Sequence, residues 1–374
     1  MTPAGIMQNA AAVRKQPQKR FLTSERKTVE FDLNSPFLII GERINPTGKK
    51  KLQAELKEGS TDLVLQYAED QESAGASVLD VNMGMSGINE TEMMLRVIEE
   101  ISEVSQLPLC LDSSSVETLE AALRKYPGRA LVNSVSYESG KMENLLPLVQ
   151  KYGAMFILLP LSDQGLPKSL EEKKTIIDAI QKHAISVGLK KEDIIVDGLV
   201  TTVSANPNAA LETLDTIRFC KEKGLATVVG LSNISFGLPE RTYINTAFLT
   251  MAISAGLTMA IANPSQDMLT AAALSSDLLL HKEDSDLRYI QYMNRKNSSE
   301  DCTVTAAPQK NNTDLIYNAV LKGNRKGITE YTEQALKDGN SAEIILNQYL
   351  LPAIDEVGKL FDCGKYFLPQ LIAS

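Results

Sequence analysis

The stretch "LPLCLDSS", residues 107–114, is an apolar run that stops abruptly at one acidic residue. Leu109, Cys110 and Leu111 form the core of the run, and Asp112 follows directly, with serines behind it. A short run that is apolar on both faces is typical of a parallel strand buried on both sides. The strand therefore carries Asp112 to its C-terminal end, and the same pattern can be sought elsewhere in the chain.

Seven further runs repeat this pattern. They are "FLIIGERIN" (37–45), "SVLDVNMG" (77–84), "RALVNSVS" (129–136), "AMFILLP" (154–160), "DIIVDGLV" (193–200), "ATVVGLSN" (226–233) and "MAIANP" (259–264). Helical stretches separate the runs, and capping boxes are expected at Ser114 with Glu117 and at Ser169 with Glu172. Eight strands alternating with helices over about 250 residues predict an α/β fold, the (β/α)8 TIM barrel.

Polar residues stand at the C-terminal ends of most of these runs. They are Glu42, Asp80, Asn82, Asp112, Asn133, Asp197 and Asn233. The C-terminal strand ends of such a barrel meet at one mouth, where active sites lie. Polar residues also mark where a strand leaves the core, but Asp and Asn are depleted in strands, so their recurrence favours a shared binding site. Carboxylates and carboxamides suit a flat heterocycle with an amide-like edge, such as a pterin or a purine.

Composition excludes several classes of function. The chain has 374 residues, 43% of them hydrophobic, and a net charge of −9 without a long basic stretch, so we expect no nucleic-acid partner. No apolar run reaches the ~20 residues that span a bilayer, and no secretory signal is present, so we expect a cytoplasmic protein without membrane contact. Two histidines and four widely spaced cysteines predict neither a metal site nor a Ser-His-Asp triad.

Six motifs together resemble a known family. "GERIN", "LDVNMG", "LCLDSS", "LVNSVS", "DGLV" and "VVGLSNISFGLPER" are similar to the methyltetrahydrofolate-binding barrel of the pterin-binding superfamily, over residues 36–285. That superfamily includes the folate domain of cobalamin-dependent methionine synthase and the methyltransferase that serves the corrinoid iron–sulfur protein. The resemblance implies a methyltransferase of one-carbon metabolism and methionine biosynthesis, which passes the N5 methyl group of 5-methyltetrahydrofolate to a cobalt(I) corrinoid.

The resemblance also implies roles for individual residues. Asp112, Asn133 and Asp197 match positions that hydrogen-bond the pterin ring, and Asn233 matches the catalytic asparagine that contacts N5. The remaining matches at the mouth are Glu42, Asp80, Asn82 and Arg241, of which Arg241 either touches ligand or braces its loop. Residues 49–51 are three lysines, which either attract the polyglutamate tail of a folate or form a solvated helical turn.

The two ends of the chain differ from the predicted barrel in composition and pattern. Residues 1–35 are expected to be a tail or linker, residues 286–312 a polar linker, and residues 313–374 an incomplete, all-α helical-bundle cap with a kink at Pro352. "DEVGKLFDCGKYFLPQLIAS" resembles the cap of corrinoid-binding modules, which implies that Phe361 and Leu368 contact the corrinoid; without the family, both read as bundle-core residues.

The cobalt-ligating DxHxxG motif of such modules does not occur in this sequence. We therefore expect the corrinoid to be held mainly by a domain or protein outside this chain, with a homocysteine-binding module as a further partner. The alternatives are the methyltransferase that serves the corrinoid iron–sulfur protein, a non-catalytic pterin-binding fragment, and a relative of dihydropteroate synthase. The last of these predicts a pyrophosphate-binding Lys and Arg at the mouth.

Overall fold

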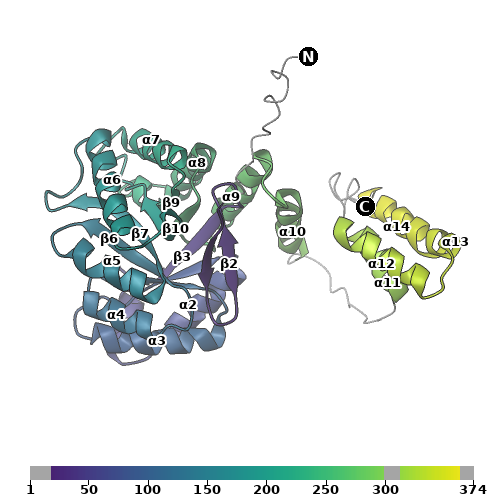
Figure 1. Ribbon diagram of the computed structural model, residues 1–374, viewed down its shortest axis with the longest axis horizontal. Helices are drawn as coiled ribbons and strands as arrows, with labels where there is room; N and C mark the ends of the chain where they lie inside the picture. The colour runs from purple at the N-terminus through teal and green to yellow at the C-terminus, as the bar shows by residue number, and fades with distance from the viewer. Residues whose placement is uncertain (1–17, 299–311, 363–374) are drawn as a thin grey trace, which may run out of the picture. The chain divides into compact units, whose positions relative to one another are not determined.

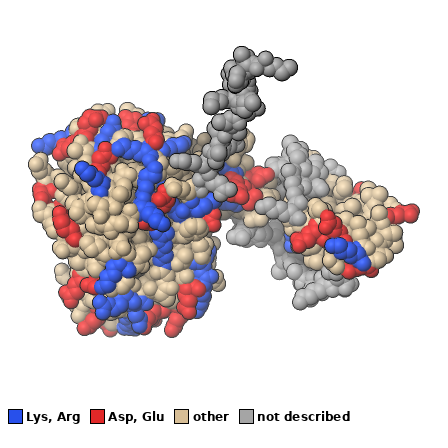
Figure 2. All heavy atoms as spheres, in the orientation of Figure 1, with Lys and Arg blue, Asp and Glu red and all other residues tan. Residues whose placement is uncertain are grey.

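The computed structural model describes residues 18–298 and 312–362, and Figure 1 shows its elements. The chain divides into two units, Met1–Glu283 and Asp284–Ser374, which are described separately. No helix within the described residues is long and apolar enough to cross a membrane. In the face of the barrel that Figure 2 presents, acidic and basic side chains are interspersed.

The first unit is a closed parallel barrel with helices around it, which confirms the predicted fold. Its strands follow the order β10-β3-β4-β5-β6-β7-β8-β9. Their bounds are β3 Leu38–Ile44, β4 Val78–Asn82, β5 Leu109–Asp112, β6 Leu131–Tyr137, β7 Met155–Ser162, β8 Ile194–Asp197, β9 Ala226–Gly230 and β10 Met259–Ala262. All eight expected strands are therefore present among the described residues.

Helices separate the strands along the chain. They are α1 Lys50–Lys57, α2 Asp62–Ser73, α3 Glu90–Val104, α4 Val116–Lys125, α5 Lys141–Tyr152, α6 Leu170–Ser186, α7 Ala209–Glu222, α8 Arg241–Ala255 and α9 Asp267–Leu279, with short 3-10 turns η2 Lys191–Asp193 and η3 Leu231–Ser235. Ser169 caps α6 by accepting a hydrogen bond from the Glu172 amide, but Glu172 Oε2 accepts from the Lys168 amide and not from that of Ser169, so only half of the expected capping box forms. The cap of α4 is Ser115 and not Ser114: Ser115 Oγ accepts from the Thr118 amide, one residue later in the serine run.

The strands carry apolar side chains on both faces because each one contacts two different cores. In β5, Leu109 and Leu111 join the cluster under the helices, whereas Cys110 points into the barrel interior. The interior cluster takes one such side chain or more from every strand, including Ile40, Val78, Cys110, Leu131, Ile195 and Val228. Side chains alternate along a strand, so the residue two positions further on also faces inward, now at the mouth.

Part of the expected N-terminal tail belongs to the barrel instead. Strands β1 Arg20–Thr23 and β2 Thr28–Phe31 form an antiparallel hairpin. Leu22, Val29 and Phe31 are buried and join the interior cluster. The reason is period-two alternation in "RFLT" and "TVEF", which gives each short strand one apolar face. The hairpin thus closes the barrel at the end opposite the mouth.

The second unit is helical. Its elements are α10 Ser285–Ser298, α11 Asn312–Leu321, α12 Arg325–Lys337, α13 Ala342–Ile345, the π-helical turn η4 Leu346–Leu350 and α14 Leu351–Asp362. Ile316, Ala335 and Ile345 form its buried cluster. Helix α10 occupies the first part of the segment expected to be a linker. The π turn ends two residues before Pro352, which lacks the amide that an α-helix needs at that point.

Candidate functional site

Six of the predicted residues lie on strands at the mouth, on the inward-facing side. Each follows an interior apolar residue by two positions, or by four in the case of Asn82: Ile40 precedes Glu42, Val78 precedes Asp80 and Asn82, Cys110 precedes Asp112, Leu131 precedes Asn133, and Ile195 precedes Asp197. The strand register places Asn82 beside Asp112, and Asp112 beside Asn133. The alternation of the strands therefore builds a ring of acids and amides.

Two carboxamides in this ring hold two carboxylates. Asn82 Nδ2 donates to Asp112 Oδ2 at 2.9 Å, and Asn133 Nδ2 donates to Asp80 Oδ1 at 3.2 Å. The Asn82 carbonyl oxygen accepts in turn from the Gly84 amide at 2.8 Å, which fixes the orientation of that side chain. These bonds connect β4, β5 and β6 and orient their polar side chains before any ligand arrives.

A second group of residues connects β3 with the loop after β9. Ser232 Oγ lies 3.3 Å from both carboxylate oxygens of Glu42. Arg241, at the start of α8, donates to the Ser232 carbonyl and to Ser235 Oγ, the latter at 3.0 Å. Arg241 therefore braces the η3 loop, one of the two roles considered for it. Asn233 is exposed on this braced loop.

Asp197 is held by its own turn. Its Oδ1 accepts from the Leu199 amide at 2.8 Å, and Leu199 adopts a left-handed backbone conformation with φ 53°. Gly198 between them is packed closely, because an added Cβ would lie 3.0 Å from Val229 Cγ1 and 3.1 Å from Thr213 Cγ2. No described group donates to Asp197 Oδ2, so this oxygen is free to accept from a ligand.

Burial raises the pKa of the acids at the mouth. It is the largest cause of the raised pKa of Asp80, with the nearby Asp112 carboxylate adding to the effect. Burial likewise raises the pKa of Asp112, of Glu42, and of Asp197, the last to about 6. Buried carboxylates whose charge is poorly compensated are typical of binding and active sites, where a ligand supplies the missing donors.

Lys49 also lies at the mouth, a position that the sequence did not distinguish from its neighbours. Its side chain is partly buried, Nζ donates to the Asn45 carbonyl at 3.0 Å, and Glu42 and Asp80 are the anionic charges that act on it. Burial lowers the pKa of Lys49. Lys50 and Lys51 are exposed. The three lysines therefore do not act as one basic cluster.

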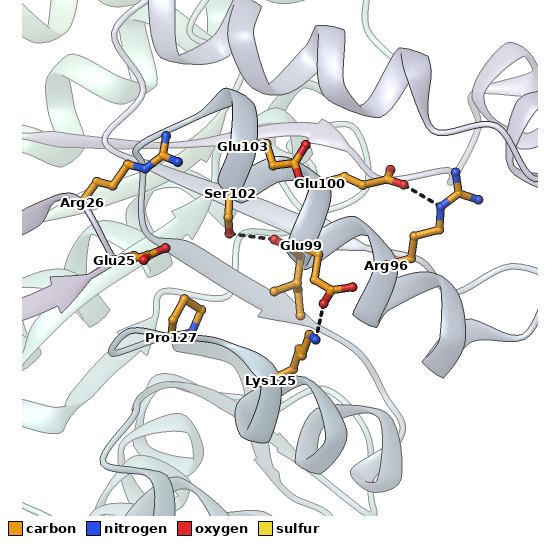
Figure 3. A pocket seen from close by; sticks show the side chains of 10 residues that line it. Glu25, Arg26, Arg96, Glu99, Glu100, Ser102, Glu103, Lys125 and Pro127 are labelled. Carbon is orange, nitrogen blue, oxygen red and sulfur yellow. Dashed lines mark hydrogen bonds and ion pairs between the residues drawn. The ribbon is translucent and has the colours of Figure 1, made fainter.

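Two of the hollows among the described residues lie at opposite ends of the barrel. One of about 110 Å³ at the mouth is lined by Asp112, Ser113, Ser114, Asn133, Ser134, Lys141 and Leu145. A larger one of about 570 Å³ lies between the β1–β2 turn and the C-terminal parts of α3 and α4 (Figure 3). Two ion pairs lie along it: Arg96 contacts Glu100 at 2.6 Å, and Lys125 contacts Glu99. The hollow at the mouth, which Asp112 and Asn133 of the ring line, is the candidate site.

Of the two expected corrinoid-contact residues, one lies within the described residues and the other does not. Phe361 lies on α14 and is 38% exposed, so it is available to a ligand instead of being buried in the helical unit. Leu368 lies outside the described residues. Among the described residues, no group of three His, Cys, Asp or Glu side chains is placed to hold a metal ion.

Comparison with protein families gives two matches. The family described as pterin binding enzyme matches residues 41–263, and the B12 binding domain family matches residues 313–374. The first match runs from within β3 to the end of β10 and includes every candidate residue at the mouth.

Curated relatives extend over the whole chain. Methionine synthase from Mycobacterium tuberculosis is 28% identical over 409 residues, and that from Mycobacterium leprae is 29% identical over 411 residues. Each alignment covers 100% of this chain and 34% of the relative, so the chain spans about a third of their length.

Solved structures show the same barrel. A dihydropteroate synthase from Yersinia pestis with a pterine-sulfa conjugate superposes with a TM-score of 0.53 at 17% identity, over 69% of this chain and 98% of that one. Dihydropteroate synthase from Thermus thermophilus gives a TM-score of 0.53 at 18% identity, over 71% and 99%. At these identities the likeness concerns the fold alone.

Proposed function

The chain belongs to the pterin-binding enzyme family, and from that premise we propose that its barrel binds 5-methyltetrahydrofolate and transfers the N5 methyl group to a cobalt(I) corrinoid. The observation that carries this proposal is the ring of buried, donor-poor carboxylates at the mouth, on a chain that also matches a B12 binding domain. The homology to methionine synthases makes methionine biosynthesis the proposed setting.

Recognition of the pterin is assigned to the ring residues. The 2-amino-4-oxo edge of a pterin presents adjacent N–H groups, and a carboxylate can accept two parallel hydrogen bonds from them. Asp112 and Asp197 are placed to accept, whereas Asn133 can both accept and donate. Glu42, Asp80 and Asn82 complete the mouth; Asn82 and Asp80 act mainly through the hydrogen bonds that orient Asp112 and Asn133.

Methyl transfer requires N5 to become a better leaving group. N5 leaves as an amine only when it is protonated or strongly hydrogen-bonded, so a polar group must accompany the reaction. The Asn233 carboxamide can accept from a protonated N5 and donate to a neutral one. Arg241 supports this role indirectly, because it fixes the loop that carries Asn233. The corrinoid supplies the nucleophile, so no protein nucleophile is required.

The C-terminal unit is the proposed corrinoid-facing part. The B12 binding domain match and the exposed Phe361 support this assignment, and they favour a methionine synthase-like enzyme over the methyltransferase that serves the corrinoid iron–sulfur protein. We assign most of the corrinoid-binding contacts to a domain or protein beyond the described residues.

A dihydropteroate synthase-like reaction is the second candidate, and one observation favours it. Lys49 and Arg241 both lie near Glu42, so the mouth does contain a lysine and an arginine. Their described hydrogen bonds, however, run to the Asn45 carbonyl and to the η3 loop, which leaves them in supporting positions. Release of pyrophosphate from a pterin diphosphate, with no methyl transfer, is the result that would select this reaction.

Methyl transfer to free cobalt(I) cobalamin, followed by its absorbance, tests the proposal. Asn233→Ala is expected to slow transfer roughly ten- to hundredfold, because the hydrogen bond to N5 strengthens during the reaction, while folate affinity changes little. Gln150→Ala, which removes an exposed carboxamide from the last turns of α5, is the matched control and should transfer normally. Equal losses of rate and affinity would remove the N5 role of Asn233, and no transfer by the wild type would refute the function.

A further inference from the structure

Lys173 is a buried lysine behind the wall of the barrel. It lies in the first turn of α6 and is only 6% exposed. Ser169 and Glu172 fix the start of this helix, since Ser169 Oγ accepts from the Glu172 amide and Glu172 Oε2 accepts from the Lys168 amide. The ammonium group is therefore directed inward by a firmly capped helix, and a buried charge needs a compensating partner.

The partners of Lys173 lie around the candidate site. Its Nζ donates to the Gly198 carbonyl at 3.2 Å, in the turn that directly follows Asp197. The charges that act on it are Glu212 of α7 and Asp197 of β8, and the Cys220 thiol of α7 is the other titratable group beside it. Among the described residues, Lys173 is in turn the side-chain charge that offsets the burial of Asp197.

The turn after β8 depends on this support. Asp197 Oδ1 is held by the Leu199 amide, Leu199 has φ 53°, and a Cβ at Gly198 would be in tight contact with Val229 and Thr213. Lys173 contacts this turn through its hydrogen bond to the Gly198 carbonyl. Moving or discharging the ammonium therefore alters both the direction of the Asp197 side chain and its electrostatic environment.

We propose that Lys173 is a positioning residue for Asp197, which anchors the turn after β8 and supplies the positive charge that keeps the Asp197 carboxylate ionised as it faces the pterin. The statement about the pterin rests on the proposed function, whereas the effect on the carboxylate does not. An apolar residue at this position would fill the same space without the cost of burying a charge, so the charge itself is the feature that needs an explanation.

The charge has a definite consequence for pH dependence. Burial raises the pKa of Asp197 to about 6, and Lys173 opposes that rise. Without the lysine the pKa of Asp197 moves further upward, and a larger fraction of Asp197 is protonated at neutral pH. A protonated carboxyl accepts fewer hydrogen bonds from a ligand. The acidic limb of folate binding should therefore move to higher pH when Lys173 loses its charge.

Lys173→Met and Lys173→Gln test the proposal, with Lys174→Met as the matched control. Lys174 is the next residue of α6, but its ammonium pairs with Glu171 at the surface. Carboxyl ¹³C NMR of Asp-labelled protein, assigned with Asp197→Asn, follows the Asp197 titration without ligand. Calorimetry measures 5-methyltetrahydrofolate affinity across the same pH range. Should Lys173→Met fail to fold, Lys173→Gln still offers a donor to the Gly198 carbonyl.

In the charge-removing variants, Asp197 is expected to titrate at higher pH than in the wild type, and folate affinity at pH 7 is expected to fall roughly fivefold or more, with the gap narrowing as pH rises. Lys174→Met should match the wild type in both measurements. An unchanged Asp197 titration, or an affinity loss of the same size at every pH, would overturn the proposal. A wild-type protein that binds no folate refutes the proposed function alone, because the carboxyl titration still decides the role of Lys173.

Discussion

Each carboxylate at the mouth follows, two positions later, an apolar side chain that fills the barrel interior. Asp80 follows Val78, Asp112 follows Cys110 and Asp197 follows Ile195. The same alternation that fills the core therefore forces these acids into a buried setting, where burial raises their pKa. A fold that needed only polar strand ends would be more stable with Ser or Asn at these positions, so the acids indicate a ligand that compensates them.

Substitution of Asp197 tests this account through the affinity for the ligand. Asp197→Ala should weaken 5-methyltetrahydrofolate binding by on the order of 1.5–3 kcal/mol, the worth of a charged hydrogen bond. Wild-type affinity should fall as pH decreases through about 6, the pKa of Asp197, because a protonated carboxyl carries no charge and accepts fewer hydrogen bonds. Calorimetry at several pH values measures both effects. Unchanged affinity in Asp197→Ala would contradict the assignment.

Substitution of Asp80 tests the burial argument through the folding stability of the protein. The folded protein holds the Asp80 proton more tightly than the unfolded chain does, so the contribution of this residue to folding stability decreases as pH rises toward its raised pKa. Asn carries no such proton and can still accept from Asn133. The free energy of unfolding of Asp80→Asn, taken relative to that of the wild type, should therefore rise by on the order of 1–3 kcal/mol as pH increases from acidic to mildly alkaline. Urea unfolding at several pH values measures this difference, and a constant difference would count against the burial argument.

At the scale of elements, the strands could be predicted from the sequence and the features between them could not. The eight runs are apolar on both faces, so "LPLCLDSS" and its counterparts are predicted to be parallel strands buried on both sides. The position of Arg241 against the η3 loop depends on how α8 packs, and no local pattern encodes it. Nor does "SLEEKK" show which lysine is buried, because the inward face of α6 is set by the neighbouring β8 and α7.

The N-terminal hairpin is the element that was hardest to predict from the sequence. Each strand has only four residues, too few for a periodic pattern to stand out from a polar tail. In the structure, however, Phe31 is fully buried at the base of the barrel interior. Residues 18–35 are thus part of the unit that positions the site.

Removal of the Phe31 ring measures that contribution. Phe31→Ala should destabilise the barrel by about 3–5 kcal/mol, the usual cost of deleting a buried aromatic side chain. Phe21→Ala is the matched control on the same hairpin, because Phe21 is 37% exposed and its loss should cost about 1 kcal/mol or less. Urea denaturation followed by far-UV circular dichroism gives both values, and similar losses in the two variants would show that the hairpin is not part of the core.

At the scale of the whole molecule, two family matches lie on one chain. The pterin-binding barrel and the segment that matches a B12 binding domain fall into separate compact units. On the proposed function, the first unit binds the methyl donor and the second is associated with the methyl acceptor. The chain spans about a third of the length of its methionine synthase relatives.

The central claim is that the acids and amides at the barrel mouth bind a reduced, methylated pterin. Calorimetric titration of the chain with 5-methyltetrahydrofolate tests it most directly, in the wild type and in Asp112→Ala, with Gln150→Ala as the surface control. The account predicts saturable binding at one site per chain, weakened at least roughly tenfold by Asp112→Ala and unchanged by Gln150→Ala. Absence of saturable binding to the folded wild type, or equal affinity in all three proteins, would contradict it.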